Sequence, residues 1–136
     1  HQKPFVFDAR GALAAAYALD DAAPAGWSEA GVEVIWRIDW TGAERRLAAA
    51  KERHTSGDVC IFDPMTGAFQ QRIDERADRL FVADVSGDRR EELVVLAGSE
   101  LHIYHNAAPN RGPARPRLWD LPHYRRSKMT WNYYSP

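Results

Sequence analysis

The sequence contains almost no cysteine and no long hydrophobic run. Cys60 is the single cysteine among 136 residues, so no disulfide can form within the chain. No apolar stretch approaches the roughly 20 residues that a helix needs to cross a bilayer, and we therefore expect no membrane partner. The chain also starts without an initiator methionine or the apolar segment of a signal peptide. Such a start is expected of a processed chain or of an excised fragment, and the fold predicted below favours a fragment.

The chain also lacks a large excess of charge of one sign, but its charges are unevenly distributed. The chain as a whole carries −1, whereas residues 1–110 carry 12 basic and 18 acidic side chains and residues 111–136 carry 6 and 1. The C-terminal stretch is therefore basic and the preceding body is acidic. Such a stretch could face an anionic partner, such as nucleic acid, a polyuronate or an acidic surface, or it could be a solvated tail.

The chain does contain a repeated pattern of strands and turns. Residues 34–50 and 80–98 each alternate in polarity, break at an acidic or glycine-containing loop and resume as a strand. Hairpin-like segments lie at 4–17, 58–72 and 100–112. Composition alone would allow a helix at 43–57, but the repeat favours a strand there. A repeat of roughly 50 residues indicates a β-propeller, whose blades are four-stranded sheets.

We therefore predict an all-β fold, namely a partial β-propeller of about two to two-and-a-half four-stranded antiparallel blades with an irregular C-terminal tail. The expected boundaries are the outer half of a blade at 1–17, a loop at 18–31, a degenerate blade at 32–73, a calcium-loop blade at 78–106 and a proline-rich basic tail at 107–136. Propellers need at least about four blades to close, so the rest of the propeller is expected to lie outside this chain.

The loop Asp84–Glu92, with the sequence DVSGDRREE, has the spacing of a calcium site. Asp84, Ser86 and Asp88 stand at its first, third and fifth positions, the carbonyl of Arg90 at the seventh and Glu92 at the ninth. Ca²⁺ prefers about six to eight oxygen ligands from a loop that folds back on itself. The flanks are strands, which excludes an EF-hand. We predict a structural Ca²⁺ in this loop; the alternative is a turn held by aspartate hydrogen bonds.

The equivalent loop at 39–47 has lost the same ligands. Thr41 and Ala43 occupy its third and fifth positions. We expect no metal in this loop.

Three motifs at consistent spacing carry a resemblance to a known family. They are the acidic loop ADVSGDRREE, the strand LHIY and the segment HYRR. The stretch from Ala83 to Trp131 resembles the C-terminal end of rhamnogalacturonan lyases of polysaccharide lyase family 11, which are FG-GAP-type β-propellers; residues 34–67 match more loosely. The resemblance implies bound Ca²⁺, an acidic polysaccharide such as rhamnogalacturonan or pectin as substrate, and an extracellular or periplasmic location.

The sequence departs from that family at three places. The tryptophan of the family's acidic loop is Arg89 here, and the Asp-Pro before the family's tyrosine is replaced by Leu121-Pro122-His123. The Asn-Gly-Thr-Lys segment that precedes the acidic loop is absent, and Arg76 at that offset keeps only the positive charge. These departures indicate a divergent branch.

Lyases of this kind cleave polyuronates by β-elimination, which needs a neutralised carboxylate, a base and an acid. The resemblance implies catalytic roles for Tyr124, as hydrogen-bond donor or acid, and for Arg76. It also implies a substrate-binding group, which consists of Arg125, His123, Lys128 and Trp131. For each residue a structural role or simple solvation remains the alternative. The base is not identified by the sequence.

A second function class fits the same motifs. A non-catalytic, calcium-stabilised FG-GAP-type propeller would bind a glycan or a protein without elimination chemistry. The enzyme requires Arg76, Tyr124 and Arg125 to converge at one end of the fold, and the binding module does not. The basic and aromatic HYRRSKMTWNYY segment has the composition of a nucleic-acid site but belongs to no recognised module, so we expect no nucleic-acid partner.

Overall fold

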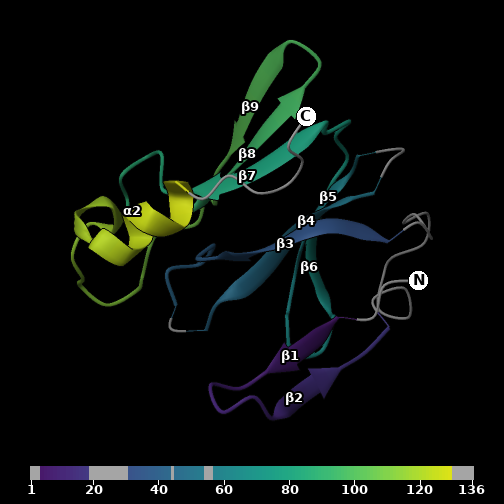
Figure 1. The fold of residues 1–136 in the computed structure, drawn as a ribbon. Helices are drawn as coiled ribbons and strands as arrows, with labels where there is room; N and C mark the ends of the chain where they lie inside the picture. The colour runs from purple at the N-terminus through teal and green to yellow at the C-terminus, as the bar shows by residue number, and fades with distance from the viewer. Residues whose placement is uncertain (1–3, 19–30, 44, 54–56, 130–136) are drawn as a thin grey trace.

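Three antiparallel sheets and a short C-terminal helix make up the computed structural model of the chain, which describes residues 4–18, 31–43, 45–53 and 57–129 (Figure 1). The first sheet is a hairpin of β1 (Phe5–Phe7) and β2 (Leu13–Ala16). The second contains β3 (Val32–Ile38), β4 (Leu47–Glu52), β5 (Val59–Phe62) and β6 (Phe69–Ile73). The third contains β7 (Arg79–Ala83), β8 (Glu92–Ala97) and β9 (Glu100–Tyr104).

Every strand pairs with its neighbour in the chain, so each sheet is an antiparallel meander. The expectation of an all-β fold is confirmed, and none of the three sheets closes into a barrel. Residues 32–73 form a four-stranded sheet, as expected for a blade. Residues 78–106 form three strands instead of four, because after β9 the chain turns away and makes no hairpin partner.

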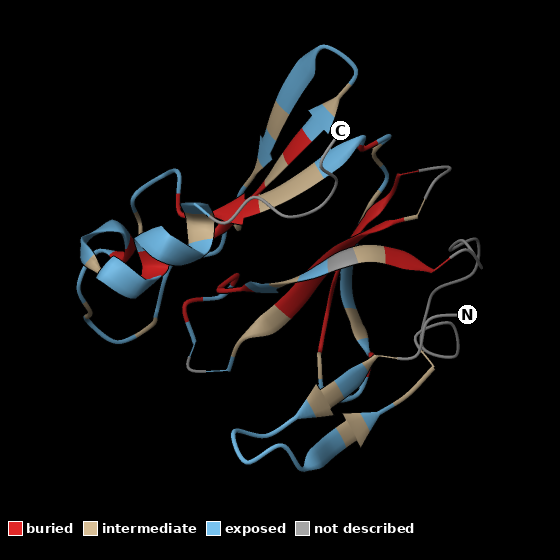
Figure 2. Ribbon diagram, in the orientation of Figure 1, coloured by how far each residue is buried: buried red, intermediate tan, exposed pale blue. Residues whose placement is uncertain are grey.

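The buried part of the second sheet is its two central strands, β4 and β5, which are largely red in Figure 2, whereas most of β6 is exposed. In β5 the alternation of a strand sends Val59 and Ile61 to one face and Cys60 and Phe62 to the other, and all four are inaccessible to solvent. The neighbouring strand β4 is alanine-rich, which lets other elements approach its two faces closely. The face with Cys60 and Phe62 is covered in part by Tyr17, which follows β2.

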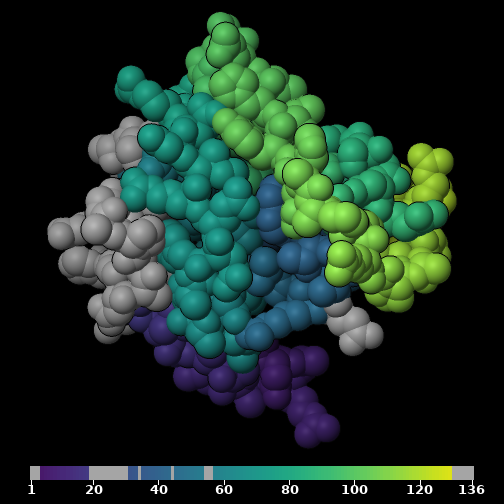
Figure 3. All heavy atoms as spheres, turned by 180° about the vertical axis from the view of Figure 1, so that it is seen from behind, coloured from purple at the N-terminus to yellow at the C-terminus, as the bar shows by residue number. Residues whose placement is uncertain are grey.

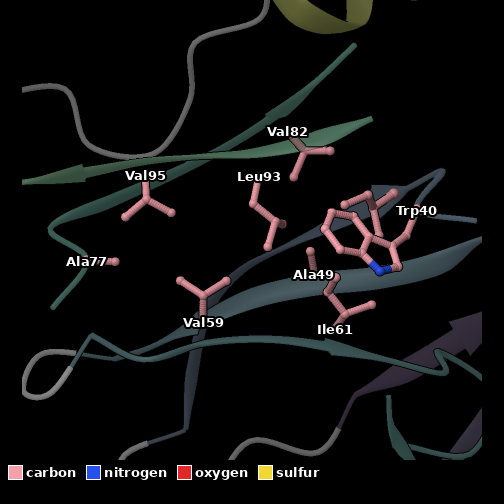
Figure 4. Close-up of a cluster of buried hydrophobic side chains, with 9 residues drawn as sticks. Trp40, Ala49, Val59, Ile61, Ala77, Val82, Leu93 and Val95 are labelled. Carbon is pink, nitrogen blue, oxygen red and sulfur yellow. The ribbon is translucent and has the colours of Figure 1, made fainter. Parts of the chain in front are cut away.

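A continuous apolar core joins the second and third sheets. Figure 4 shows the side chains of both sheets meeting between their facing strands. Leu93 and Val95 of β8 and Val82 of β7 pack on a cluster from the second sheet, which consists of Ile38, Ala49, Val59 and Ile61. The second and third sheets are thus stacked face to face.

The opposite face of the third sheet is apolar but exposed. Leu101 and Ile103 of β9 are 62% and 50% exposed, and Leu96 of β8 is 39% exposed. They alternate with the inward-facing Leu93 and Val95 along the same sheet. Exposure of this much contiguous apolar surface to water is unfavourable.

The expected irregular tail is wrong for residues 118–129. Leu118–Asp120 form a 3₁₀ turn and Pro122–Met129 form the helix α2. Proline is favoured in the first turn of a helix because its missing N–H is not needed there. Arg126 and Lys128 lie in the last turn, where positive charge interacts favourably with the helix dipole. Both signals are present in the sequence.

The remaining expectations concern the loop at 18–31 and the absence of a membrane-spanning segment. Most of the loop expected at 18–31 falls outside the described residues. Among the helices in the described part, none has the length and apolar character required to span a membrane.

Candidate functional site

The Asp84–Glu92 loop joins β7 to β8 and is held by its own carboxylates. Asp84 accepts a hydrogen bond from the Gly87 N–H at 2.7 Å. Glu92 accepts from the N–H groups of Val85 and Ser86 at 2.7 and 3.1 Å and from the Ser86 hydroxyl at 2.9 Å. Two carboxylates therefore satisfy the backbone of the loop, in the manner of aspartate-stabilised turns.

Asp88 is paired with Arg90 inside the same loop. One carboxylate oxygen accepts from the Arg90 backbone N–H at 2.8 Å, and the other accepts from the guanidinium Nε and Nη2 at 2.8 and 2.5 Å. Burial raises the pKa of Asp88, but the hydrogen bonds and charge of Arg90 outweigh it, so the pKa lies below its ordinary value. Arg90 also donates to the carbonyl of Ala108 at 2.6 Å.

The loop has oxygen-bearing side chains and two residues of positive φ, but its carboxylates are not gathered around one point. Gly87 and Arg89 have φ of 79° and 72°, and the positive value is uncommon for arginine. Burial first, and then the charges of Glu92 and Asp88, raise the pKa of Asp84, as expected when carboxylates converge. However, no group of three or more metal-ligating side chains is gathered anywhere in the described residues. Arg90 already neutralises Asp88, so an ion would have to compete with it.

The loop at 39–47 has the same turn as the acidic loop, although only the first of the three aligned acidic positions, Asp39, is kept and the other two are Ala43 and Leu47. Asp39 accepts from the Gly42 N–H at 3.1 Å, as Asp84 does from Gly87, and Gly42 has a φ of 78°. The Thr41 hydroxyl accepts from the Ala43 N–H at 3.2 Å. The two loops are thus structural repeats of each other.

The two loops are hydrogen-bonded to each other. The Asp39 N–H donates to a carboxylate oxygen of Glu91 at 2.8 Å, and the Glu91 N–H donates to the Asp39 carbonyl at 2.9 Å. Both residues are at most 2% exposed. A buried acidic pair thus lies where the second and third sheets meet.

The charges of this acidic pair are balanced by basic residues, two of them from the C-terminal segment. Arg46 lies 3.3 Å from the Asp39 carboxylate, and Arg115 forms a second ion pair with the same oxygen. The Lys128 ammonium lies 2.9 Å from Oε1 of Glu91, whereas the Asp39 N–H donates to Oε2. Oδ2 of Asp39 and Oε1 of Glu91 have no partner of hydrogen-bonding geometry among the described residues, so the ion pairs are their main compensation.

Lys128 is enclosed by aromatic rings. Its ammonium lies 5.6, 5.8 and 5.0 Å from the ring centroids of Trp36, Phe81 and Tyr124, and it donates to the Val82 carbonyl at 2.5 Å. Only 8% of its side chain is exposed. Cation–π contact and the ion pair with Glu91 therefore hold the ammonium inside the protein. In this structure the residue predicted to bind substrate contacts the chain itself.

Tyr124 is buried, at 3% exposure. Its hydroxyl accepts a hydrogen bond from the Asp84 N–H at 2.8 Å. Burial, followed by the nearby carboxylates of Glu91 and Asp84, raises its pKa above the ordinary tyrosine value. Trp119 packs edge-on against the ring at 5.1 Å and donates to the Asp84 carbonyl. The hydroxyl is therefore bound to the start of the acidic loop.

The structure does not bring the two predicted catalytic residues together. Arg76 is exposed and precedes β7, whereas Tyr124 contacts Asp84, which follows β7. The five residues of that strand span about 17 Å. Arg125 and His123 lie exposed on α2, where Arg125 donates to the Trp119 carbonyl at 3.1 Å. Trp131 lies outside the described residues.

A second polar cluster was not expected from the sequence. Glu75 accepts from the Tyr104 hydroxyl and lies 2.7 Å from the His102 ring, which also contacts Glu100 at 3.1 Å. Hydrogen bonds to the two glutamates raise the pKa of His102, and those from Tyr104 and His102 lower the pKa of Glu75. His102 and Tyr104 lie two residues apart on β9 and therefore on one face of the strand, and this spacing is the sequence signal that could have predicted the cluster.

The chain matches no protein-family profile, no characterised protein and no solved structure in the three comparisons made.

Proposed function

We propose that the chain forms consecutive blades at the C-terminal end of a β-propeller, and that this part of the protein is an acidic-glycan-binding scaffold. The four-stranded and three-stranded sheets stack face to face, and both begin with a strand, a loop of the same turn geometry and a second strand. The exposed face formed by Leu96, Leu101 and Ile103 is where a further blade would pack.

One observation favours a scaffold over a catalytic centre in this part of the chain. The Tyr124 hydroxyl is buried and accepts a hydrogen bond from the Asp84 N–H, and Arg76 lies at the other end of β7. A general acid must reach the leaving group of its substrate. Elimination chemistry in the parent protein, if it is a rhamnogalacturonan lyase, would then come from other blades.

The outer surface of α2 supports the choice of an acidic glycan as ligand. Arg125 and His123 are exposed there, and Trp119 beside them is 37% exposed. A guanidinium can pair with a uronate carboxylate through two hydrogen bonds, and an indole face can pack against a sugar ring. The rest of the basic segment is less available, because Arg115 and Lys128 are engaged by buried carboxylates.

The lyase candidate and the role of Tyr124 can be tested together in the parent protein. Rhamnogalacturonan is incubated with wild type and with Tyr124→Phe, and the absorbance of the unsaturated uronate product is followed. We expect Tyr124→Phe to keep the wild-type turnover, if there is any, but to lose about 1–3 kcal/mol of stability because the Asp84 N–H is left without its acceptor. Arg125→Ala is expected to weaken glycan binding without changing stability.

Two results would contradict this assignment. Loss of turnover in Tyr124→Phe at unchanged melting temperature would make the hydroxyl catalytic. Equal glycan binding by wild type and Arg125→Ala would remove α2 from the binding surface.

We further propose that the Asp84–Glu92 loop takes up Ca²⁺ in competition with Arg90. Asp84, Ser86, Asp88, Glu92 and the Arg90 carbonyl supply the oxygen types that Ca²⁺ prefers, and the bound ion would brace the turn between β7 and β8. This role is structural.

Calorimetric titration with CaCl₂ tests the calcium proposal. Wild type is expected to bind one ion, Asp88→Ala to bind none, and Arg90→Met to bind more tightly than wild type because Asp88 is released from its ion pair. Asp120→Ala, on the exposed 3₁₀ turn, is the matched control and should titrate like wild type. Identical titration curves for wild type and Asp88→Ala would rule out this site.

A further inference from the structure

The buried acidic pair formed by Asp39 and Glu91 has a feature that neither the fold nor the glycan surface explains. Asp39, which follows β3, and Glu91, which precedes β8, are joined by two hydrogen bonds: the Asp39 N–H donates to the Glu91 carboxylate, and the Glu91 N–H donates to the Asp39 backbone carbonyl. Both side chains are almost inaccessible to solvent. Burying two carboxylates in a protein interior is strongly unfavourable without nearby positive charge. The residues that supply this positive charge are therefore needed for the second and third sheets to pack together.

We propose that residues 106–128, here called the strap, form an internal clamp whose Arg115 and Lys128 supply this charge. Arg115 pairs with Asp39 and Lys128 with Glu91, so each carboxylate receives a cation from the same C-terminal segment. Arg46, which belongs to the 39–47 loop and not to the strap, also forms an ion pair with Asp39. The clamp needs no metal ion at the Asp39 loop.

The strap also binds both loops through hydrogen bonds to their backbone carbonyl groups. Asn106 donates to the Trp40 carbonyl at 3.1 Å, and Asn110 donates to the Asp88 carbonyl at 3.0 Å. Arg115 donates to the Arg89 carbonyl as well. Figure 3 shows the light-green segment after β9 lying against the blue atoms of the β3 and β4 region. One continuous segment is thus fastened to the loops of both sheets.

Close backbone approach makes the position of the strap specific. A Cβ atom at Gly112 would overlap the carbonyl group of Gly42, so only glycine allows the strap to lie this close to the Asp39 loop. Gly42 is the same residue whose N–H binds the Asp39 carboxylate. The strap therefore fits the turn of the first loop in shape as well as in charge.

The two loops differ in the source of the positive charge that their carboxylates meet. In the acidic loop, Asp84 shares its turn with Asp88 and Glu92, the oxygen set proposed for Ca²⁺. In the first loop those two positions are Ala43 and Leu47, and the remaining Asp39 carboxylate is bound by two guanidinium groups. Arginine thus supplies to the first loop the positive charge that an ion would supply to the second.

Amide hydrogen exchange of the full chain in EDTA tests the strap. Arg115→Met removes the charge and keeps much of the side-chain volume, and Arg117→Met is the matched control, because Arg117 is exposed two residues further on. In wild type and Arg117→Met we expect the Asp39 and Glu91 amides to be protected. In Arg115→Met their protection should fall about tenfold or more, as expected from losing a charged partner of a buried carboxylate.

Equal protection in Arg115→Met and Arg117→Met would overturn the proposal. If Arg115→Met does not fold, the double variant Asp39→Asn with Arg115→Met decides the question. Recovery of folding and of loop protection in the double variant supports charge compensation by the strap. Failure of the double variant as well would show that Arg115 acts by something other than charge, and the proposal would be wrong.

Discussion

Replacing Lys128 by methionine is expected to lower the free energy of unfolding by about 3–5 kcal/mol. The substitution removes the ammonium that faces Glu91 and leaves that carboxylate, which is 1% exposed, without its ion-pair partner. Methionine can still fill the space between the rings of Trp36, Phe81 and Tyr124, so the loss reports charge rather than volume. Urea unfolding followed by tryptophan fluorescence measures the difference.

A double-mutant cycle separates the ion pair from general damage to the helix. Glu91→Gln combined with Lys128→Met should regain much of the lost stability, since no uncompensated charge remains. Arg125→Met on the same helix is the control, and we expect it to change stability by less than about 1 kcal/mol because Arg125 is exposed. A Lys128→Met variant as stable as the control would show that Glu91 does not depend on Lys128.

The sheets were predictable because strand signals are local. Alternation in residues such as Leu93 and Val95, and the turn-forming Gly42 and Gly87, mark β3–β4 and β7–β8 from the sequence alone. The repeat then aligned one acidic loop with the other. The absence of a fourth strand from the third sheet has no such local signal in the sequence. The alternation in β9 is typical of a strand, and its hairpin partner was assumed from the repeat.

The C-terminal segment was the part that sequence reasoning described least well. The excess of basic residues after position 110 indicated either an external anionic partner or a solvated tail. Two of these residues, Arg115 and Lys128, instead pair with Asp39 and Glu91, which lie 76 and 37 positions earlier in the chain. A net-charge count cannot identify pairing at such separation. It also cannot reveal that Tyr124 is buried and bonded to Asp84.

Replacing Leu93 by alanine is expected to cost about 2–5 kcal/mol, because the side chain is fully buried between the two stacked sheets and its removal leaves a cavity. Leu101→Ala on the adjacent strand is the matched control. Leu101 is 62% exposed in this chain, so the same chemical change should cost less than about 1 kcal/mol here. Both values come from urea unfolding of the chain.

The same pair of variants tests the proposed propeller when it is placed in a longer protein that carries the proposed further blades. If a further blade covers the face with Leu96, Leu101 and Ile103, Leu101→Ala should become clearly destabilising there, by about 2 kcal/mol or more, while Leu93→Ala keeps its effect. An unchanged, near-neutral Leu101→Ala in the parent would mean that this face stays in water and that the sheets form an open stack. The strap would then hold together the interface between the second and third sheets. Lys128→Met would remain destabilising in both contexts, since the contacts of Lys128 lie wholly within this chain.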